Sequence, residues 1–97
     1  MAKARRYLNA FEAVGFDRRD AEHLRIRAEL MLELERIISA RQLTQVEAAK
    51  LFRVTQPRIS DLVRGRIDRF SIDTLVELLA RVDTAVTVKL RRRKHVA

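Results

Sequence analysis

Apolar and polar positions between Leu43 and Gly65 follow the period of two short helices joined by a tight corner. Thr44 is followed three residues later by Glu47, which is the pattern of a capping box. In that motif the threonine oxygen accepts from the Glu47 amide, and the glutamate side chain reaches back to the Thr44 amide. The first helix is therefore predicted to run from Gln45 to about Phe52, burying Ala48, Ala49 and Phe52 on one side.

The second helix of this pair is predicted to begin after Thr55, a favourable N-cap. Pro57 falls in its first turn, where the missing amide hydrogen costs nothing, and Gly65 stands where a left-handed residue would end it. Counting 100° per residue from Gln56 separates two faces. The apolar face holds Ile59, Leu62 and Val63, and the polar face holds Pro57, Ser60, Asp61 and Arg64.

The polar face of a single helix is most often simply solvated. Here the polar helix follows another capped helix after a corner of three residues, and this combination favours a helix-turn-helix over a solvated surface helix. Gln56 and Arg58 flank the polar face, which would present hydrogen-bonding groups to base edges or phosphates.

A long helix precedes the pair and is predicted from about Arg18 to Ala40, with Asp17 as its cap. Its apolar residues form two adjacent stripes, made of Ala21, Leu24, Ala28, Met31 and Ile38 and of Ile26, Leu30, Leu34 and Ile37. This surface is wider than one small bundle requires, so we expect part of it to meet another subunit or protein. His23 beside it is expected to be packed and hydrogen-bonded, because no pattern of further ligands completes a metal site.

The C-terminal third changes its period. Ser71 is the predicted N-cap of a last helix, with Phe70 and Leu75 forming a hydrophobic staple, and its core residues would be Ile72, Leu75, Val76, Leu78 and Leu79. From Ala85 to Arg91 apolar and polar residues alternate, which predicts a half-buried strand. A lone strand leaves its backbone unpaired, so we expect an identical strand of a second copy to pair with it through Val86, Val88 and Leu90.

Composition narrows the class of function. The chain has 97 residues, a net charge of +8 and a pI of about 11.2, which favours a nucleic acid as partner. One small domain leaves little room for a catalytic pocket, and no nucleophile–base set is present, so we expect no enzyme, catalytic residue, cofactor or metal. Aromatic residues make up only 5% of the chain, which disfavours the stacking platforms of RNA-binding proteins. No apolar run is long enough for a signal peptide or membrane span, and the absence of cysteine suits a reducing cytosol.

The helix pair resembles the DNA-binding domains of the Xre (Cro and lambda-repressor-like) transcriptional regulators. The likeness is carried by Gln45, Ala49, the corner Val54-Thr55-Gln56 and Ile59, with Arg53 standing where that family commonly has glycine. The run TQPRISDLVRGRIDRFSIDTLVELL, together with NAFEAVGF, is similar to the HigA-type antitoxin branch. That resemblance implies a bacterial cytoplasmic regulator, associated with the nucleoid, that also neutralises a ribosome-dependent RNA-cutting toxin. The alternative is a stand-alone, phage-repressor-like Xre regulator without a toxin partner.

The resemblance implies that residues 56–61 enter the major groove of double-stranded DNA. The expected base-reading residues are Gln56, Pro57, Arg58, Ser60 and Asp61. Gln56 suits adenine, Arg58 guanine or phosphate, and Asp61 the cytosine amino group. The expected phosphate contacts are Gln45, Lys50, Arg53, Thr55 and Arg64.

The fold predicted from these observations is all-α, a lambda-repressor-like helix-turn-helix bundle of four to five helices with a single C-terminal β-strand that pairs across a homodimer. Three parts are expected. Residues 1–16 form an N-terminal arm with a short apolar segment, residues 17–82 the DNA-binding domain with its motif at 44–65, and residues 83–97 the strand and a basic tail. A dimer of this kind would bind an operator with two half-sites.

Overall fold

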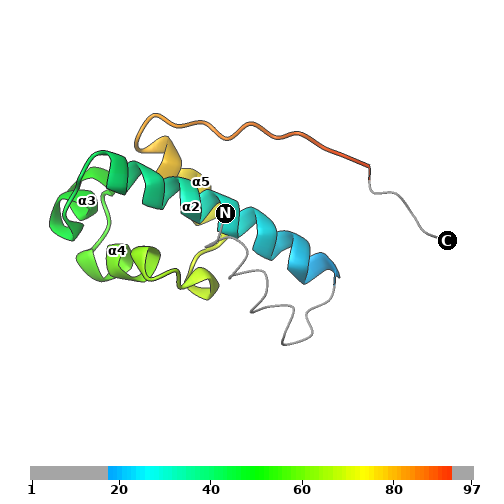
Figure 1. Ribbon diagram of the computed structural model, residues 1–97, viewed down its shortest axis with the longest axis horizontal. Helices are drawn as coiled ribbons and strands as arrows, with labels where there is room; N and C mark the ends of the chain where they lie inside the picture. Colours follow the sequence, from blue (N-terminus) through cyan, green and yellow to red (C-terminus); the bar gives the residue numbers. More distant parts are fainter. Residues whose placement is uncertain (1–17, 93–97) are drawn as a thin grey trace.

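The computed structural model describes residues 18–92 of the chain and is entirely helical over that range. Its elements are α2 (Arg18–Ala40), α3 (Gln45–Phe52), α4 (Gln56–Val63), the 3₁₀ turn η1 (Ile67–Arg69) and α5 (Ile72–Ala80) (Figure 1). The helix ranges expected from the sequence at 18–40, 45–52 and after Thr55 are confirmed. The N-terminal arm, the Asp17 cap and the end of the basic tail lie outside the described residues.

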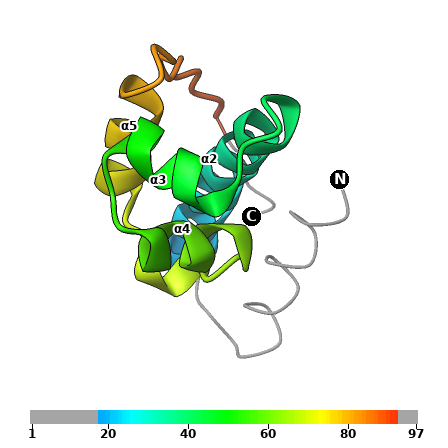
Figure 2. The same ribbon diagram turned by 90° about the vertical axis from the view of Figure 1, so that its left-hand side faces the viewer.

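The long helix α2 is the element on which the others pack. It contacts α4, η1 and α5, while α3 and α4 pack against each other near its C-terminal end (Figures 1 and 2). Six residues of α2 are buried: Leu24, Ala28, Met31, Leu34, Ile37 and Ile38. They share one core with Phe52, Ile59, Leu62, Phe70, Leu75 and Leu79. The two predicted stripes thus merge into one core-facing surface, and the part expected to meet another protein is largely buried within the domain.

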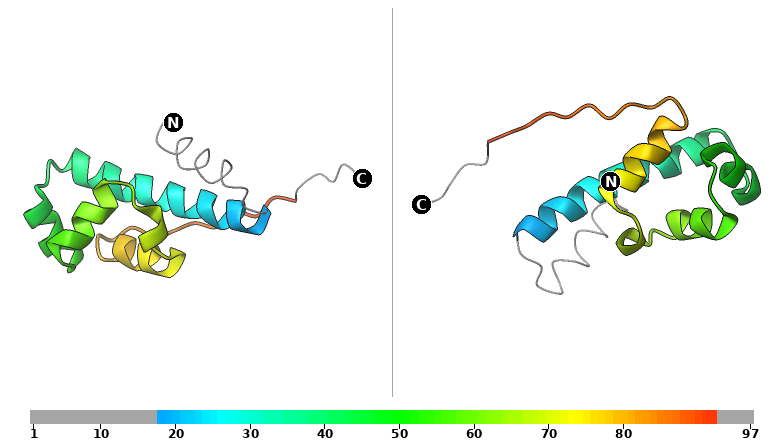
Figure 3. Two further views of the ribbon diagram at one scale, coloured as in Figure 1. Left: turned by 90° about the horizontal axis from the view of Figure 1, so that it is seen from below. Right: turned by 180° about the vertical axis from the view of Figure 1, so that it is seen from behind.

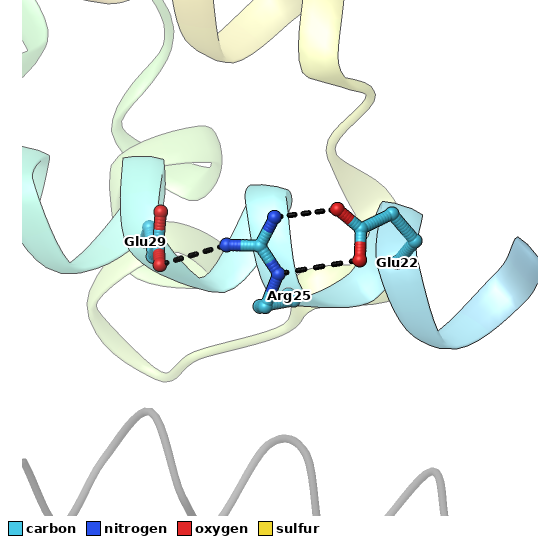
Figure 4. A network of polar contacts seen from close by, with 3 residues as sticks. All are labelled: Glu22, Arg25 and Glu29. Atoms are coloured by element: carbon cyan, nitrogen blue, oxygen red, sulfur yellow. Dashed lines mark hydrogen bonds and ion pairs between the residues drawn. The ribbon is translucent and has the colours of Figure 1, made fainter. Parts of the chain in front are cut away.

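The outer face of α2 is covered by ion pairs within the helix. Arg25 pairs with both Glu22 and Glu29 (Figure 4), and Arg36 pairs with Glu33. The hydrogen bond to Glu22 is the largest cause that raises the pKa of Arg25 above its ordinary value. Such exposed pairs add little stability, but they neutralise this side of the molecule. His23 lies on a different side of α2, beside Arg27 and the beginning of α5, and it is exposed, so the expectation of a packed histidine is wrong.

Each of the three later α-helices begins with a side-chain cap. The Thr44 oxygen accepts from the Glu47 amide at 3.1 Å, and the Glu47 carboxylate accepts from the Thr44 amide at 2.8 Å, which confirms the capping box. The bond from the Thr44 amide holds the pKa of Glu47 below its ordinary value. Thr55 and Ser71 cap α4 and α5 as predicted. Local side-chain chemistry therefore sets where these helices begin.

The four α-helices within residues 18–92 each end through a left-handed residue: Gln42, Arg53, Gly65 and Asp83, at φ values between 53° and 73°. At each end the next amide donates to the carbonyl five residues back, as Val54 does to Ala49 and Arg66 does to Asp61, both at 3.0 Å. This is the Schellman motif, which normally uses glycine because a Cβ atom disfavours the left-handed region. Only Gly65 meets that preference, so the other three ends carry backbone strain.

Two expectations for the C-terminal third do not agree with the structure. Val76 was expected in the core but is 38% exposed, because α5 buries only Leu75, Leu78 and Leu79 in the described core. No strand forms at 85–91 within residues 18–92. Residues 84–92 instead extend away from the helices, back toward the N-terminal end of α2 (Figures 1 and 3). An alternating segment has no strand to pair with among the described elements, which are all helices.

The left-handed corner generates a stability prediction. Arg53→Gly removes the steric cost of φ 58°, whereas Arg53→Ala keeps a Cβ atom, and both remove the same guanidinium. The glycine variant should therefore be more stable than the alanine variant by about 1 kcal/mol. Urea unfolding followed by circular dichroism measures the difference.

Lys50 provides the control for this prediction, since it lies inside α3. There the order should reverse, with Lys50→Ala more stable than Lys50→Gly by about 1 kcal/mol. An alanine variant at Arg53 as stable as the glycine variant would contradict the claim of strain at the corner.

Candidate nucleic-acid interface

The corner between α3 and α4 is held by the side chain of Arg81, the C-cap residue of α5. Arg81 donates to the carbonyl oxygen of Phe52 at 2.7 Å and to that of Arg53 at 3.3 Å, and it also pairs with Glu77. Its positive charge lies at the C-terminal end of α3, where helix carbonyls lack internal partners. The sequence analysis missed Arg81, because 28 residues separate it from Arg53 and no local pattern links them.

One group of predicted contact residues comes together at the junction of α3 and α4. Gln45, at the beginning of α3, and Gln56, Pro57 and Ser60 of α4 line a shallow open hollow. Gln45 and Gln56 are exposed, and no hydrogen bond or ion pair within residues 18–92 occupies their side chains. An exposed side-chain amide without a hydrogen-bond partner can offer a donor and an acceptor together, and the edge of an adenine base requires both.

Arg58, a predicted base-reading residue, is engaged inside the protein. Its guanidinium lies 4.2 Å above the ring centroid of Phe70, and its Nη1 donates to the Arg69 carbonyl at 2.9 Å. Stacking on the aromatic ring and the hydrogen bond together fix the side chain against the segment that follows α4. Arg58 could reach a guanine only by giving up both contacts.

Asp61 is likewise occupied. One of its carboxylate oxygens accepts from Arg69 Nη1 at 3.0 Å and lies 3.8 Å from Arg66 Nε. The side chain is only 20% exposed. The sequence placed Asp61 correctly on the polar face of α4 but gave no sign of these two partners, which come from the η1 segment.

The predicted phosphate contacts fall into two groups. Lys50, Arg53 and Arg64 are exposed, and their side chains form no hydrogen bond or ion pair in the part of the chain that the structure describes. They are therefore available for a polyanion. The Thr55 hydroxyl is used as a cap, accepting from the Arg58 amide at 3.4 Å, and its position at the beginning of α4 puts it beside free helix amides.

The described residues hold neither a metal-binding cluster nor a membrane-spanning helix. Among residues 18–92, no three His, Asp or Glu side chains lie together so that they could hold a metal ion. Nor does any helix in that range have the length and apolar character needed to cross a bilayer. The contact residues predicted from the sequence lie on α3, on α4 and at the corner between them.

Comparisons with known proteins agree with this geometry. No curated protein matches the chain. A solved structure described as a "Putative XRE Family Transcriptional Regulator" superposes with a TM-score of 0.70 and 28% sequence identity, covering 80% of this chain and 88% of that one. The family model named HTH_37, described as a helix-turn-helix domain, matches residues 13–91. Because this match spans most of the 97 residues, the protein belongs to this helix-turn-helix domain family.

Proposed function

We propose that the protein is a transcriptional regulator that binds specific sequences of double-stranded DNA through α4. The observation that carries the proposal is the polar surface where Gln45, Gln56 and Ser60 meet, whose two glutamines are exposed and have no partner within residues 18–92. The same helix pair carries the exposed cations Lys50, Arg53 and Arg64. The similarity to an XRE-family regulator supports the same function.

The geometry suits the major groove of B-DNA, which admits one α-helix. α4 is the helix with an outward polar face, and its first turn carries Gln56, whose amide can form two hydrogen bonds with adenine. Pro57 and Ser60 complete the contact surface. The beginnings of α3 and α4, at Gln45 and Thr55, direct amides toward phosphate oxygens, and Lys50, Arg53 and Arg64 supply charge without selecting a sequence.

Of the base-reading residues expected from the sequence, Gln56 and Ser60 are therefore the ones we propose for direct readout. Arg58 is proposed to act mainly by anchoring the segment after α4, because reading a base would break its stacking on Phe70 and its bond to the Arg69 carbonyl.

We also propose a homodimer that pairs through residues 85–91. Val88 and Leu90 are 76% and 89% exposed, and Val86 is exposed on the same side of the alternation. Such an apolar, extended and unpaired segment is a template for pairing with an identical one. The segment leaves on the side of α2 opposite α4, so a partner paired there would leave the α4 face open to DNA (Figures 1 and 2).

The proposal that Gln56 reads a base is tested by replacing each of two glutamines on the same surface with alanine. Gln56→Ala should cost about 1–3 kcal/mol of binding free energy on the operator and little on random duplexes, because base contacts carry specificity. Gln45→Ala is the matched control and should weaken binding to both DNAs alike. Gel-shift titrations on an operator selected from random duplexes provide the measurement. Equal losses on the two DNAs for Gln56→Ala would sink its assignment as a base-reading residue.

The dimer proposal is tested by changing one face of the C-terminal segment. Val88→Glu puts a charge on the proposed paired face and should convert the dimer into a monomer, with loss of binding to a two-half-site operator. Thr87→Glu, on the opposite face of the alternation, should leave the dimer intact. Sedimentation velocity distinguishes monomer from dimer. If the Val88→Glu protein remained dimeric, the interface would have to lie elsewhere.

Antitoxin activity is a further and separate proposal, supported by the resemblance of residues 55–79 to the HigA-type branch. The described structure narrows the surface available to a toxin. The apolar face of α2 is largely buried in its own core, and Glu22, Glu29 and Glu33 are paired with arginines of the same helix. The remaining surface proposed for a toxin is the segment containing Phe11, Val14 and Phe16, which lies outside the described residues.

Co-expression with the product of the adjacent gene tests this proposal. That product should arrest growth when expressed alone and co-purify with the full chain. A chain lacking residues 1–16 should still bind DNA but should lose the ability to neutralise the toxin. An adjacent product that is harmless and does not co-purify would end the antitoxin proposal, while the regulator proposal would stand on α3 and α4.

A further inference from the structure

The segment after α4 brings two arginines to the side of the helix away from α3. Arg66 precedes η1 and Arg69 ends it, and both side chains are about half exposed. They meet α4 at Asp61, whereas the hollow shared with α3 meets α4 at Gln56 and Ser60. On the helical projection, Gln56 and Ser60 lie toward one edge of the polar face and Asp61 toward the other. The polar face of α4 is thus flanked by the beginning of α3 on one side and by these arginines on the other.

The η1 segment is fixed by contacts on two sides. Arg27 of α2 donates to the Ile67 carbonyl at 3.3 Å, and Arg58 of α4 donates to the Arg69 carbonyl at 2.9 Å. Ile67 and Phe70, which bracket the segment, are both buried in the core. A backbone anchored in this way loses little further conformational freedom when its side chains bind a ligand.

Asp61 then restricts the Arg69 side chain. The guanidinium uses Nη1 for the carboxylate, and a guanidinium has five N–H donors in a planar fork. Donors on Nε and Nη2 therefore remain for another planar or tetrahedral anion. Asp61 itself, with two arginine neighbours and little exposure, is poorly placed to accept from a base.

We propose that Arg69, with Arg66 beside it, contacts DNA phosphates on the wall of the major groove opposite the one that α3 contacts, and that Asp61 is the positioning residue that orients Arg69. This inference rests on the proposed function. A helix in the major groove has a phosphate backbone on each side, and the α3 end supplies contacts to one of them. The η1 arginines supply the other, and Asp61 does not read cytosine.

The main alternative is that Asp61 opposes DNA binding by Arg69 instead of supporting it. A carboxylate can hold an arginine away from DNA and cancel its charge, in which case removing the carboxylate would strengthen binding. The two roles predict opposite signs in a double-mutant cycle, which measures how the effect of one substitution depends on the other.

The cycle uses Arg69→Ala, Asp61→Asn and the double variant, with dissociation constants measured on operator and random duplexes over a series of salt concentrations. Arg69→Ala should weaken binding to both DNAs by about five- to tenfold and reduce the slope of log K against log salt by about 1, the signature of one lost phosphate contact. Asp61→Asn should weaken both DNAs too, and the double variant should bind no worse than Arg69→Ala alone. Arg69→Lys should restore part of the salt slope, because it keeps the charge without the fork.

Three outcomes would overturn the inference. Asp61→Asn could relax the preference at one operator base pair, which would make it a base-reading residue. Arg69→Ala could cost more in the Asp61→Asn background than in the native chain, which would show sequestration. The salt slope could also stay unchanged in Arg69→Ala. If Arg69 had only a structural role, Arg69→Ala would lower the stability of the fold, measured by urea unfolding, without altering the salt slope.

A second measurement does not depend on the Asp61 variant folding. Ethylation of the operator phosphates that Arg69 contacts should weaken binding of the native chain but should not weaken binding of the Arg69→Ala variant. Identical interference patterns for the two proteins would also overturn the inference. If the native chain binds no double-stranded DNA, the proposed function itself fails. If it binds DNA with Gln56-dependent specificity but shows no coupling between Asp61 and Arg69, only this inference fails.

Discussion

The direction in which α4 leaves α3 depends on the left-handed backbone of Arg53. With φ 58° and ψ 45° at this residue, the chain closes the Schellman bonds of α3 and reaches the Thr55 cap two residues later. Arg81 satisfies the carbonyls of Phe52 and Arg53 from α5 and so ties the corner to the core. The orientation of the exposed face of α4 therefore depends on the strained backbone of Arg53 and on the guanidinium of Arg81, which is distant in sequence. A residue other than glycine can persist in that conformation because these surrounding contacts determine it.

Helix beginnings could be predicted from sequence because capping is local. Thr44 with Glu47, Thr55 and Ser71 each lie within three residues of the amide that they accept from. The ends of α2 and α3 were also predicted correctly, but the left-handed backbone that follows each helix was not, since only Gly65 carries a sequence signal for it, while Gln42 and Asp83 adopt it without one. Val76 shows a related limit. Hydrophobic periodicity tells which residues share a face, but only the packing of neighbouring elements decides how much of that face is covered.

For the candidate interface, the sequence identified the helix and its polar face but not the state of each side chain. The contacts that occupy Arg58 and Asp61 come from residues 5 to 12 positions later in the chain, across a turn whose path has no periodic pattern. The net charge of +8 also says less about where DNA would bind than the positions of the individual charges do. Arg25, Arg36 and Arg81 are used in ion pairs, and Arg27 and Arg58 donate to backbone carbonyls. Lys50, Arg53 and Arg64, in contrast, lie on α3 or at the C-terminal ends of α3 and α4, and they are among the described cations without such a partner.

The most direct test of this account is to map the DNA-contacting surface by nuclear magnetic resonance. The ¹⁵N-labelled full chain would be titrated with its operator duplex while the backbone amide signals are followed. The account predicts that the largest shifts occur at the beginning of α3, along α4 and at η1, including Gln45, Gln56 and Arg69. The amides of the paired outer face of α2, from Glu22 to Glu29, should not move. Shifts confined to the basic C-terminal residues, with the signals of α4 unchanged, would contradict the central claim that α4 enters the groove.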